Sequence, residues 1–136
     1  MNKTLFSCGL ILVLGMLLTN AASAQTTSIF DTWPELKTFH GVMSTTFHPA
    51  EQGDLKPIRT RSGEMVEKAT ALAKSKVPAE VNKPEVLAAL KKLRSGSKSL
   101  HKLVKKQGSD VEITKSLTAL HDVFHEIVGL CTDEDH

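Results

Sequence analysis

Apolar residues recur every three or four positions along most of this chain, in four stretches that proline and glycine separate. This spacing places apolar side chains on one face of an α-helix and polar side chains on the other. No stretch alternates apolar and polar residues as a half-buried β-strand does. Amphipathic helices joined by short connections bury their apolar faces against one another. The sequence therefore predicts an all-α fold, an up-down-up-down four-helix bundle over residues 32–132.

The first two predicted helices have recognisable ends. Residues 32–35 read Thr-Trp-Pro-Glu, a capping box with a proline in the first turn. We expect this helix to stop after His48 because Pro49 follows. A second helix restarts after residues 53–54 and runs to a break near residues 77–78. The apolar stripe of the first helix is Leu36, Phe39, Met43 and Phe47, and that of the second is Ile58, Met65, Val66, Ala69, Leu72 and Ala73.

The last two predicted helices share one short connection. Asn82 is expected to cap the third helix, with Pro84 in its first turn, and Gly108 is expected to end it. Residues 109–112 read Ser-Asp-Val-Glu, a second capping box that opens the last helix. The two stripes are Leu87, Leu90, Leu93, Leu100, Leu103 and Val104, then Ile113, Leu117, Leu120, Phe124, Ile127, Val128 and Cys131.

The start of the chain has the pattern of an export signal. Lys3 precedes an apolar run at residues 10–18 that is too short to span a bilayer, and residues 22–24 read Ala-Ser-Ala, a cleavage signal. Cys8 lies before the apolar run, so it does not fit a lipoprotein anchor. We expect a cleaved signal peptide (1–24), a flexible lead-in (25–31), an acidic tail (133–136) and a periplasmic or secreted protein without a membrane anchor. Cys131 is then the single cysteine left, which excludes an internal disulfide.

Size and charge exclude several classes of protein. The chain has 136 residues and a formal charge of +2, so neither a multidomain enzyme nor a nucleic-acid-binding protein is expected. Residues 83–106 hold eight basic side chains and one acidic one, while residues 107–136 hold seven acidic and one basic. This pattern fits a docking patch for an acidic partner or a membrane surface, or two adjacent helices with complementary solvated faces. We favour the second interpretation. The sequence identifies no protein partner.

Histidines supply the candidate site, since six occur in this small chain. His121 and His125 are four residues apart on the last helix, a spacing that lets two imidazoles bind one metal ion. If the first and last helices are antiparallel and Pro34 lies level with Cys131, paired positions sum to about 165. His40 then lies opposite His125, and Ser44 lies opposite His121. Met43 and His48 belong to the same helix as His40, and the third helix brings His101 near this level.

The ligand types favour a transition metal. Imidazole with a thioether suits copper, with sulfur favouring Cu(I), whereas imidazole alone suits Zn(II), Cu(II) or Ni(II). Each candidate also has a structural alternative, as a hydrogen-bonded boundary histidine, a core methionine or a buried inert thiol. No His-Glu-x-x-His motif, nucleophile–base pair or paired carboxylate occurs, so we expect binding or carriage of copper or zinc and no enzymatic activity. The predicted ligands are His40, His121 and His125, then Met43 and His48, and less strongly His101 and Cys131.

An exported four-helix chain with Met43 in its first helix and His125 late in its last resembles the soluble b-type and c′-type cytochromes of the periplasm. The resemblance implies non-covalent haem b, with Met43 and His125 as axial ligands, as an alternative to a bare metal ion. Covalent haem is excluded because no Cys-x-x-Cys-His motif occurs. Residues 40–51 and 121–131 also look like small exported bacterial helical proteins without that motif. A further alternative is a metal-free interaction module that uses the basic third helix.

Overall fold

The computed structural model describes residues 27–132, which form five α-helices and one short 3-10 helix. The elements are α1 (Ile29–Thr32), α2 (Pro34–Glu51), α3 (Lys56–Lys74), η1 (Ala79–Val81), α4 (Pro84–Lys105) and α5 (Asp110–Thr132). No strand occurs in this range, so the predicted all-α fold is confirmed. The expected signal peptide, residues 25–26 and the acidic tail lie outside the described residues. None of the helices between residues 27 and 132 has the length and apolar content that a membrane span requires.

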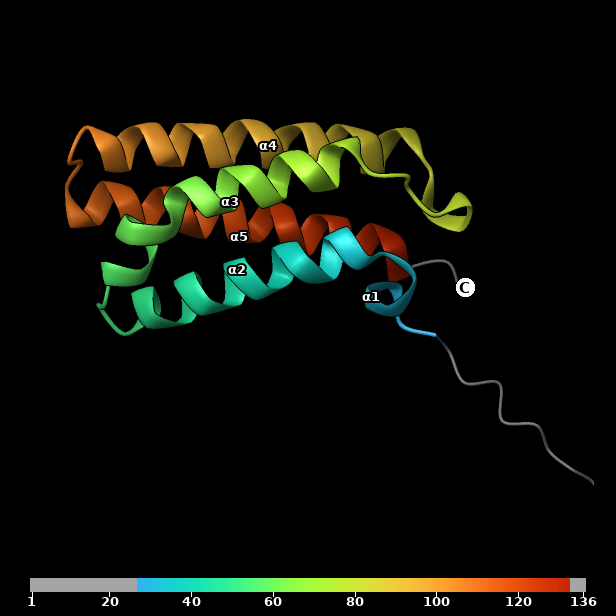
Figure 1. Cartoon of the computed structure of the whole chain (residues 1–136), viewed down its shortest axis with the longest axis horizontal. Coiled ribbons are helices and arrows are strands. Elements are labelled where there is room, and N and C mark those ends of the chain that lie inside the picture. Colours follow the sequence, from blue (N-terminus) through green and yellow to red (C-terminus); the bar gives the residue numbers. More distant parts are fainter. Residues whose placement is uncertain (1–26, 133–136) are drawn as a thin grey trace, which may run out of the picture.

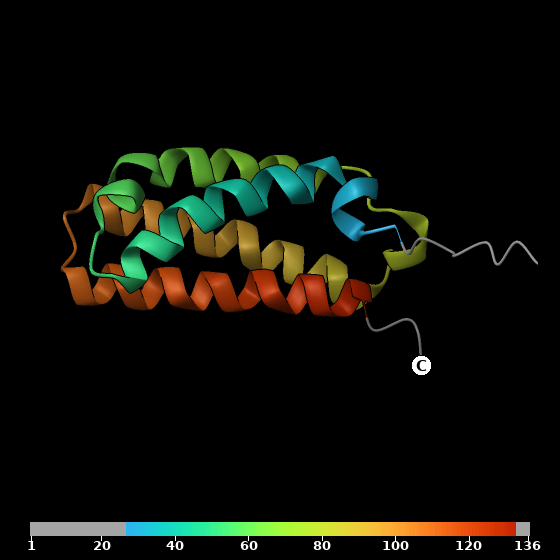
Figure 2. The ribbon, with the colours of Figure 1, turned by 90° about the horizontal axis from the view of Figure 1, so that it is seen from below.

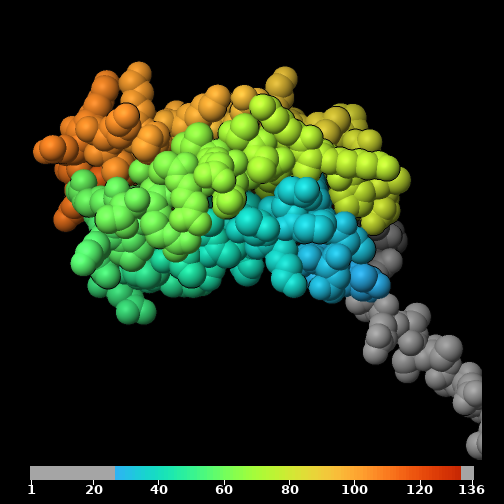
Figure 3. All heavy atoms as spheres, in the orientation of Figure 1, coloured from blue at the N-terminus to red at the C-terminus, as the bar shows by residue number. Residues whose placement is uncertain are grey.

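The four long helices, α2 to α5, pack side by side along a common direction (Figure 1). Each of them contacts the next one in the chain, and a smaller contact joins α2 to α5. Figure 2 shows α2 running obliquely to α5, and α1 contacts both of these helices. On the face seen in Figure 3, the side chains of α2 and α3 close the space between their ribbons. The weaker α2–α5 contact matters below, because the histidines lie there.

The core draws on every long helix at the predicted three- and four-residue steps. Each fully buried Leu, Ile, Phe or Met side chain stabilises the fold by about 1.5–3 kcal/mol. Leu87 departs from the prediction because it is 46% exposed. The stripe of α4 begins instead at Val86, which lies one residue and about 100° away from Leu87, and continues through Leu90 as predicted. The largest fully buried side chains are Trp33, Leu36, Phe39, Met43, Ile58, Met65, Leu72, Leu93, Leu100, Ile113, Leu117 and Ile127.

The start of α2 corrects the first capping box. Trp33 is the N-cap residue of α2 and makes no side-chain capping bond. The Thr32 hydroxyl donates instead to the carbonyl of Ile29 at 3.3 Å, because Thr32 is the last residue of α1. The Trp33 ring is 1% exposed, and its Nε1–H donates to the Ser75 hydroxyl oxygen at 2.8 Å. Trp33 thus anchors the start of α2 to the end of α3.

Helix α1 occupies part of the segment that the sequence assigned to a flexible lead-in. Ile29 and Phe30 are partly buried against the core, which explains why this short turn is ordered. The Phe30 ring lies 5.1 Å from the His40 ring and 6.5 Å from the Phe124 ring, measured between centroids. Helix α1 therefore covers one end of the α2–α5 pair.

The end of α2 also differs from the prediction. The helix does not stop after His48 but continues through Pro49 to Glu51. The fixed φ of proline is helical, so a last turn forms around Pro49 with only one backbone N–H missing. Gly53 then reverses the chain with a φ of 86°, a conformation that glycine adopts without strain. The extra turn keeps His48 and Glu51 on one helix.

The ends of α4 lie close to, but not at, the predicted caps. Its N-cap residue is Lys83, without a side-chain capping bond, so Asn82 does not cap the helix. At the other end Gln107 takes the left-handed conformation, with a φ of 57°. The Gln107 N–H donates to Val104 at 2.9 Å, and the Gly108 N–H donates to Leu103 at 3.0 Å. These two bonds form a Schellman motif, in which α4 ends at Lys105 and Gln107, one residue before the predicted glycine, takes the left-handed position.

The second capping box is confirmed at the start of α5. The Ser109 N–H donates to Glu112 Oε2 at 2.9 Å, and the Glu112 N–H donates to the Ser109 hydroxyl at 3.3 Å. The hydrogen bonds from Ser109 lower the pKa of the Glu112 carboxyl. The box fixes the residue at which α5 begins, and hence the level of its histidines.

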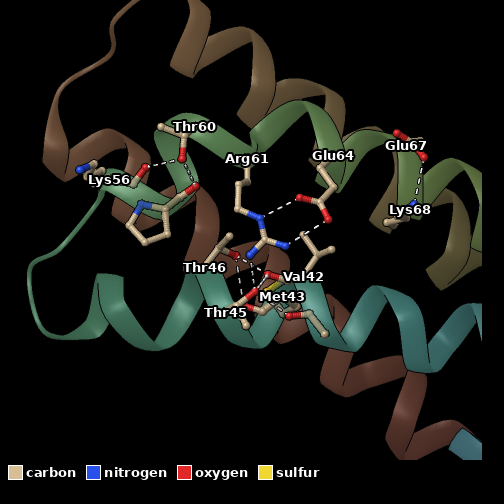
Figure 4. A network of polar contacts seen from close by, with 12 residues as sticks. Val42, Met43, Thr45, Thr46, Lys56, Thr60, Arg61, Glu64, Glu67 and Lys68 are labelled. Carbon is tan, nitrogen blue, oxygen red and sulfur yellow. Dashed lines mark hydrogen bonds and ion pairs between the residues drawn. The ribbon is translucent and has the colours of Figure 1, made fainter.

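A polar clamp holds α3 against α2 (Figure 4). The Arg61 guanidinium donates to both carboxylate oxygens of Glu64, at 2.7 and 3.0 Å, and to the Thr45 hydroxyl oxygen at 2.6 Å. Thr45 donates in turn to the Gly41 carbonyl at 2.7 Å. The hydrogen bonds from Arg61 lower the pKa of the Glu64 carboxyl. Arg61 thus contacts the middle of α2 at Thr45, next to Ser44, which lines the candidate site.

Candidate metal centre

A cavity of about 200 Å³ lies between α2 and α5, where the contact between these helices is small. Helix α2 contributes four residues to its lining and α5 contributes three. The five residues predicted first as metal ligands are all among them. The lining consists of His40, Met43, Ser44, His48, His121, Phe124 and His125.

Ring contacts between α2 and α5 test the predicted register. The His40 ring stacks on Phe124, the neighbour of its predicted partner His125, with centroids 5.5 Å apart and planes 10° apart. The Phe47 ring stacks on His121, with centroids 3.7 Å apart and planes 9° apart. Phe47 lies three residues beyond Ser44, the predicted partner of His121. The two ring contacts thus lie within about one helical turn of the predicted residue pairs.

The two histidines of α5 face each other at their Nε2 atoms. These atoms are 3.1 Å apart, and the ring planes meet at 71°. Two imidazole nitrogens on one tetrahedral ion, each about 2.0–2.1 Å from it, are about 3.3 Å apart. In the absence of an ion, the same spacing fits an Nε2–H of one ring donating to the Nε2 lone pair of the other. The pair thus has the separation that a two-nitrogen chelate requires.

The surroundings of His121 favour its neutral form. Burial lowers the pKa of His121, and the nearby His125 lowers it further, while Asp122 and Glu51 act in the opposite direction. A lowered pKa keeps an imidazole lone pair free at neutral pH. Because a metal ion binds only the deprotonated nitrogen, this environment favours ligation.

His48 stands at the exposed rim of the cavity. Its Nδ1 lies 3.0 Å from Glu51 Oε2, and both side chains are mostly exposed. A carboxylate that engages one ring nitrogen leaves the other nitrogen for a ligand, as in many histidine–metal sites. Glu51 was not among the predicted site residues, because the helix was expected to stop after His48 and only the extra turn places Glu51 three residues further on the same helix.

The two weaker candidates lie away from this cavity. His101 is bonded to Ser62, with His101 Nδ1 2.9 Å from the serine hydroxyl oxygen, across the contact between α3 and α4. Cys131 lies near the end of α5, in the lining of a second cavity of about 580 Å³ that includes residues of α1 and η1. Burial raises the pKa of the Cys131 thiol, which disfavours the thiolate that binds metals. Neither residue joins the His121–His125 pair.

The other predicted ligands in the lining, His40, Met43 and His48, lie near the pair but are not arranged with it as a metal site. Among the residues from 27 to 132, no group of three or more His, Cys, Asp or Glu side chains is arranged to hold a metal ion. His40 is stacked on Phe124, and His48 is bonded to Glu51. The geometry therefore brings two candidate nitrogen ligands together, and a metal site here would need a third ligand from another residue type or from movement of a ring.

Comparisons with protein-family models, with curated proteins and with solved structures found no match for the chain. The structure shows a small all-helical domain, and the resemblance to cytochromes stays a prediction.

Proposed function

We propose that this chain is an exported helical-bundle protein that binds and carries one copper or zinc ion, without catalysing a reaction. The observation that carries the proposal is the His121–His125 pair, whose Nε2 atoms are 3.1 Å apart beside a cavity that His40, Met43 and His48 also line. Two histidines and a methionine of α2 therefore lie beside the histidine pair of α5.

The proposal includes the up-down-up-down arrangement of α2 to α5. Support comes from the order of contacts, since each long helix contacts the next and α5 returns to contact α2. The His40 ring near the start of α2 stacks on Phe124 in the second half of α5, as antiparallel packing of these two helices requires. In such bundles, metal and cofactor sites form between side chains that face each other from neighbouring helices.

The size of the cavity favours an ion over haem b. Met43 and His125, the alternative axial ligands, both line it. However, its volume is about 200 Å³, below the range of about 300–1,000 Å³ typical of pockets for drug-sized ligands. A porphyrin would have to separate α2 from α5 and displace the stacked rings of Phe47 and His121. An ion needs only the space between the ligand atoms.

One contact argues against an interaction module built on the basic helix. Lys92 of α4 lies 3.3 Å from a carboxylate oxygen of Glu126 of α5, so the basic and acidic helices meet at their exposed edges. This pairing supports complementary solvated faces, as favoured from the sequence. Exposed pairs of this kind contribute about 0–1 kcal/mol each, so they set solubility more than stability.

Metal analysis of the full chain, purified without a histidine tag, tests the proposal. We expect about one copper or zinc ion per chain after loading and desalting. The double substitution His121→Ala with His125→Ala should abolish the uptake. His101→Ala is the matched control, because it removes a histidine bonded to Ser62 outside the cavity. Unchanged uptake in the double variant would overturn the proposal.

Addition of haemin to the same preparation separates the ion from the cytochrome-like alternative. The proposal predicts no Soret band beyond that of free haemin. A Soret band of bound haem that disappears in Met43→Ala would favour haem b instead.

A further inference from the structure

We infer that the cavity selects Cu(I) over Zn(II), with the Met43 thioether as the third ligand beside His121 and His125. This inference rests on the proposed metal-binding function and identifies its cargo.

The His121–His125 pair needs a third ligand to hold an ion. Within the described part of the chain, no further His, Cys, Asp or Glu completes a group of three with the pair. His40 is held by stacking on Phe124, and His48 is held by Glu51 at the exposed rim. The donors that remain in the lining are the Met43 sulfur and the Ser44 hydroxyl. A neutral serine hydroxyl is a weak ligand for copper and zinc, so Met43 is the stronger candidate.

The position of Met43 suits this role. The side chain is 1% exposed, so the surrounding core fixes it, yet it lines the cavity. It belongs to the turn of α2 that follows His40 and precedes Phe47, the ring that stacks on His121.

The chemistry of two imidazoles and one thioether then discriminates between the metals. Thioether sulfur is a soft ligand that selects Cu(I). Zn(II) in closed protein sites takes four ligands, commonly with thiolate or carboxylate among them. All three donors in this set are neutral, so no ligand offsets the second charge of Zn(II).

The apolar side chains next to His121 increase this difference. Phe124 forms part of the lining of the cavity, and Phe47 stacks on the His121 ring. His40, His48 and His125 are exposed, so these apolar rings shield only the His121 side of the site. The hydration that an ion loses on that side costs more for a divalent ion than for a monovalent one.

Competition titrations of the full chain test the inference. Under anaerobic, reducing conditions a chromogenic Cu(I) chelator such as bicinchoninate reports the affinity for Cu(I), and a chromogenic zinc chelator reports that for Zn(II). Met43→Leu should weaken Cu(I) binding about tenfold or more and should change Zn(II) binding less than about twofold. The matched control is Met65→Leu, since Met65 is also fully buried but lies on α3 outside the cavity.

X-ray absorption at the copper edge adds a readout that a loss of packing does not mimic. The wild-type chain should show a copper–sulfur shell that Met43→Leu lacks and Met65→Leu retains. Wild-type protein that prefers Zn(II), or a Met43→Leu variant with unchanged Cu(I) affinity and spectrum, would overturn the inference and leave metal binding intact. A wild-type chain that binds neither ion would overturn the proposed function as well.

Discussion

The His121 imidazole lies face to face with the phenyl ring of Phe47, with ring centroids 3.7 Å apart and planes 9° apart. Phe47 is 8% exposed, so the core holds its ring in place. The stack restricts rotation of the imidazole and keeps its Nε2 atom directed at His125. Phe47 therefore acts as a positioning residue for the proposed chelate.

Replacement of Phe47 by leucine removes the stacked ring but keeps an apolar side chain. We expect metal affinity to fall about tenfold, as for other groups that orient a ligand without touching the ion. The fold should lose about 1 kcal/mol from the lost ring contact. Chelator competition and urea unfolding measure the two effects. Phe39→Leu is the control, since this buried ring of α2 packs on Phe124 instead. Equal metal affinity in both variants would contradict the positioning role.

The lowered pKa of His121 predicts how the stability of the metal-free protein depends on pH. The unfolded chain binds a proton at this residue near pH 6.5, whereas the folded chain resists protonation because the ring is partly buried and lies beside His125. Below pH 6.5 the unfolded state therefore holds more protons, and stability falls as pH falls. The stabilisation is fully present above pH 6.5 and is lost as pH drops through the folded pKa.

Urea unfolding between about pH 5 and 8 measures this dependence. The wild-type midpoint should fall on acidification more than the midpoint of His121→Gln, which has no titrating ring. Parallel pH profiles for the two proteins would show that His121 does not carry the effect.

The long helices were predictable because their apolar stripes are local patterns. Helix α1 was not, because it is four residues long and is ordered by packing of Ile29 and Phe30 on distant core residues. Trp33 is a second case in which a tertiary contact could not be predicted from a local pattern. It occurs inside a local capping pattern, yet its ring is buried and bonded to Ser75, a partner that no local pattern identifies.

The candidate site was predictable to the level of helix faces. The spacing of His121 and His125 and an assumed antiparallel register were enough to gather His40, Met43 and His48 around them. The ring contacts were not predictable, because they depend on the oblique approach of α2 to α5 (Figure 2). The exclusion of His101 depends on one hydrogen bond between α3 and α4, which the sequence does not encode locally.

The His101–Ser62 bond predicts an asymmetric effect of substitution. Ser62 is 2% exposed, so His101→Ala leaves a buried hydroxyl without its partner and should cost about 1–2 kcal/mol. Ser62→Ala should cost less, because the partly exposed His101 ring can bond to water instead. Urea unfolding compares the two variants, and metal uptake should be unchanged in both. A larger loss for Ser62→Ala would contradict this interpretation of the pair.

Two helical glycines offer a matched test of packing. A Cβ at Gly63 would lie 3.5 Å from His101 Cε1, an ordinary contact, so Gly63→Ala should gain most of the helix propensity of alanine, about 0.5–1 kcal/mol. A Cβ at Gly96 would lie 2.9 Å from Leu120 Cδ1, and Leu120 is itself 3% exposed.

Leu120 would have to leave its packed position to admit that methyl group, at a cost of about 1–3 kcal/mol that outweighs the gain in propensity. Gly96→Ala should therefore unfold at lower urea concentration than the wild type, and Gly63→Ala at higher. Equal stabilisation by both substitutions would mean that α4 and α5 pack less tightly at Gly96 than the structure describes.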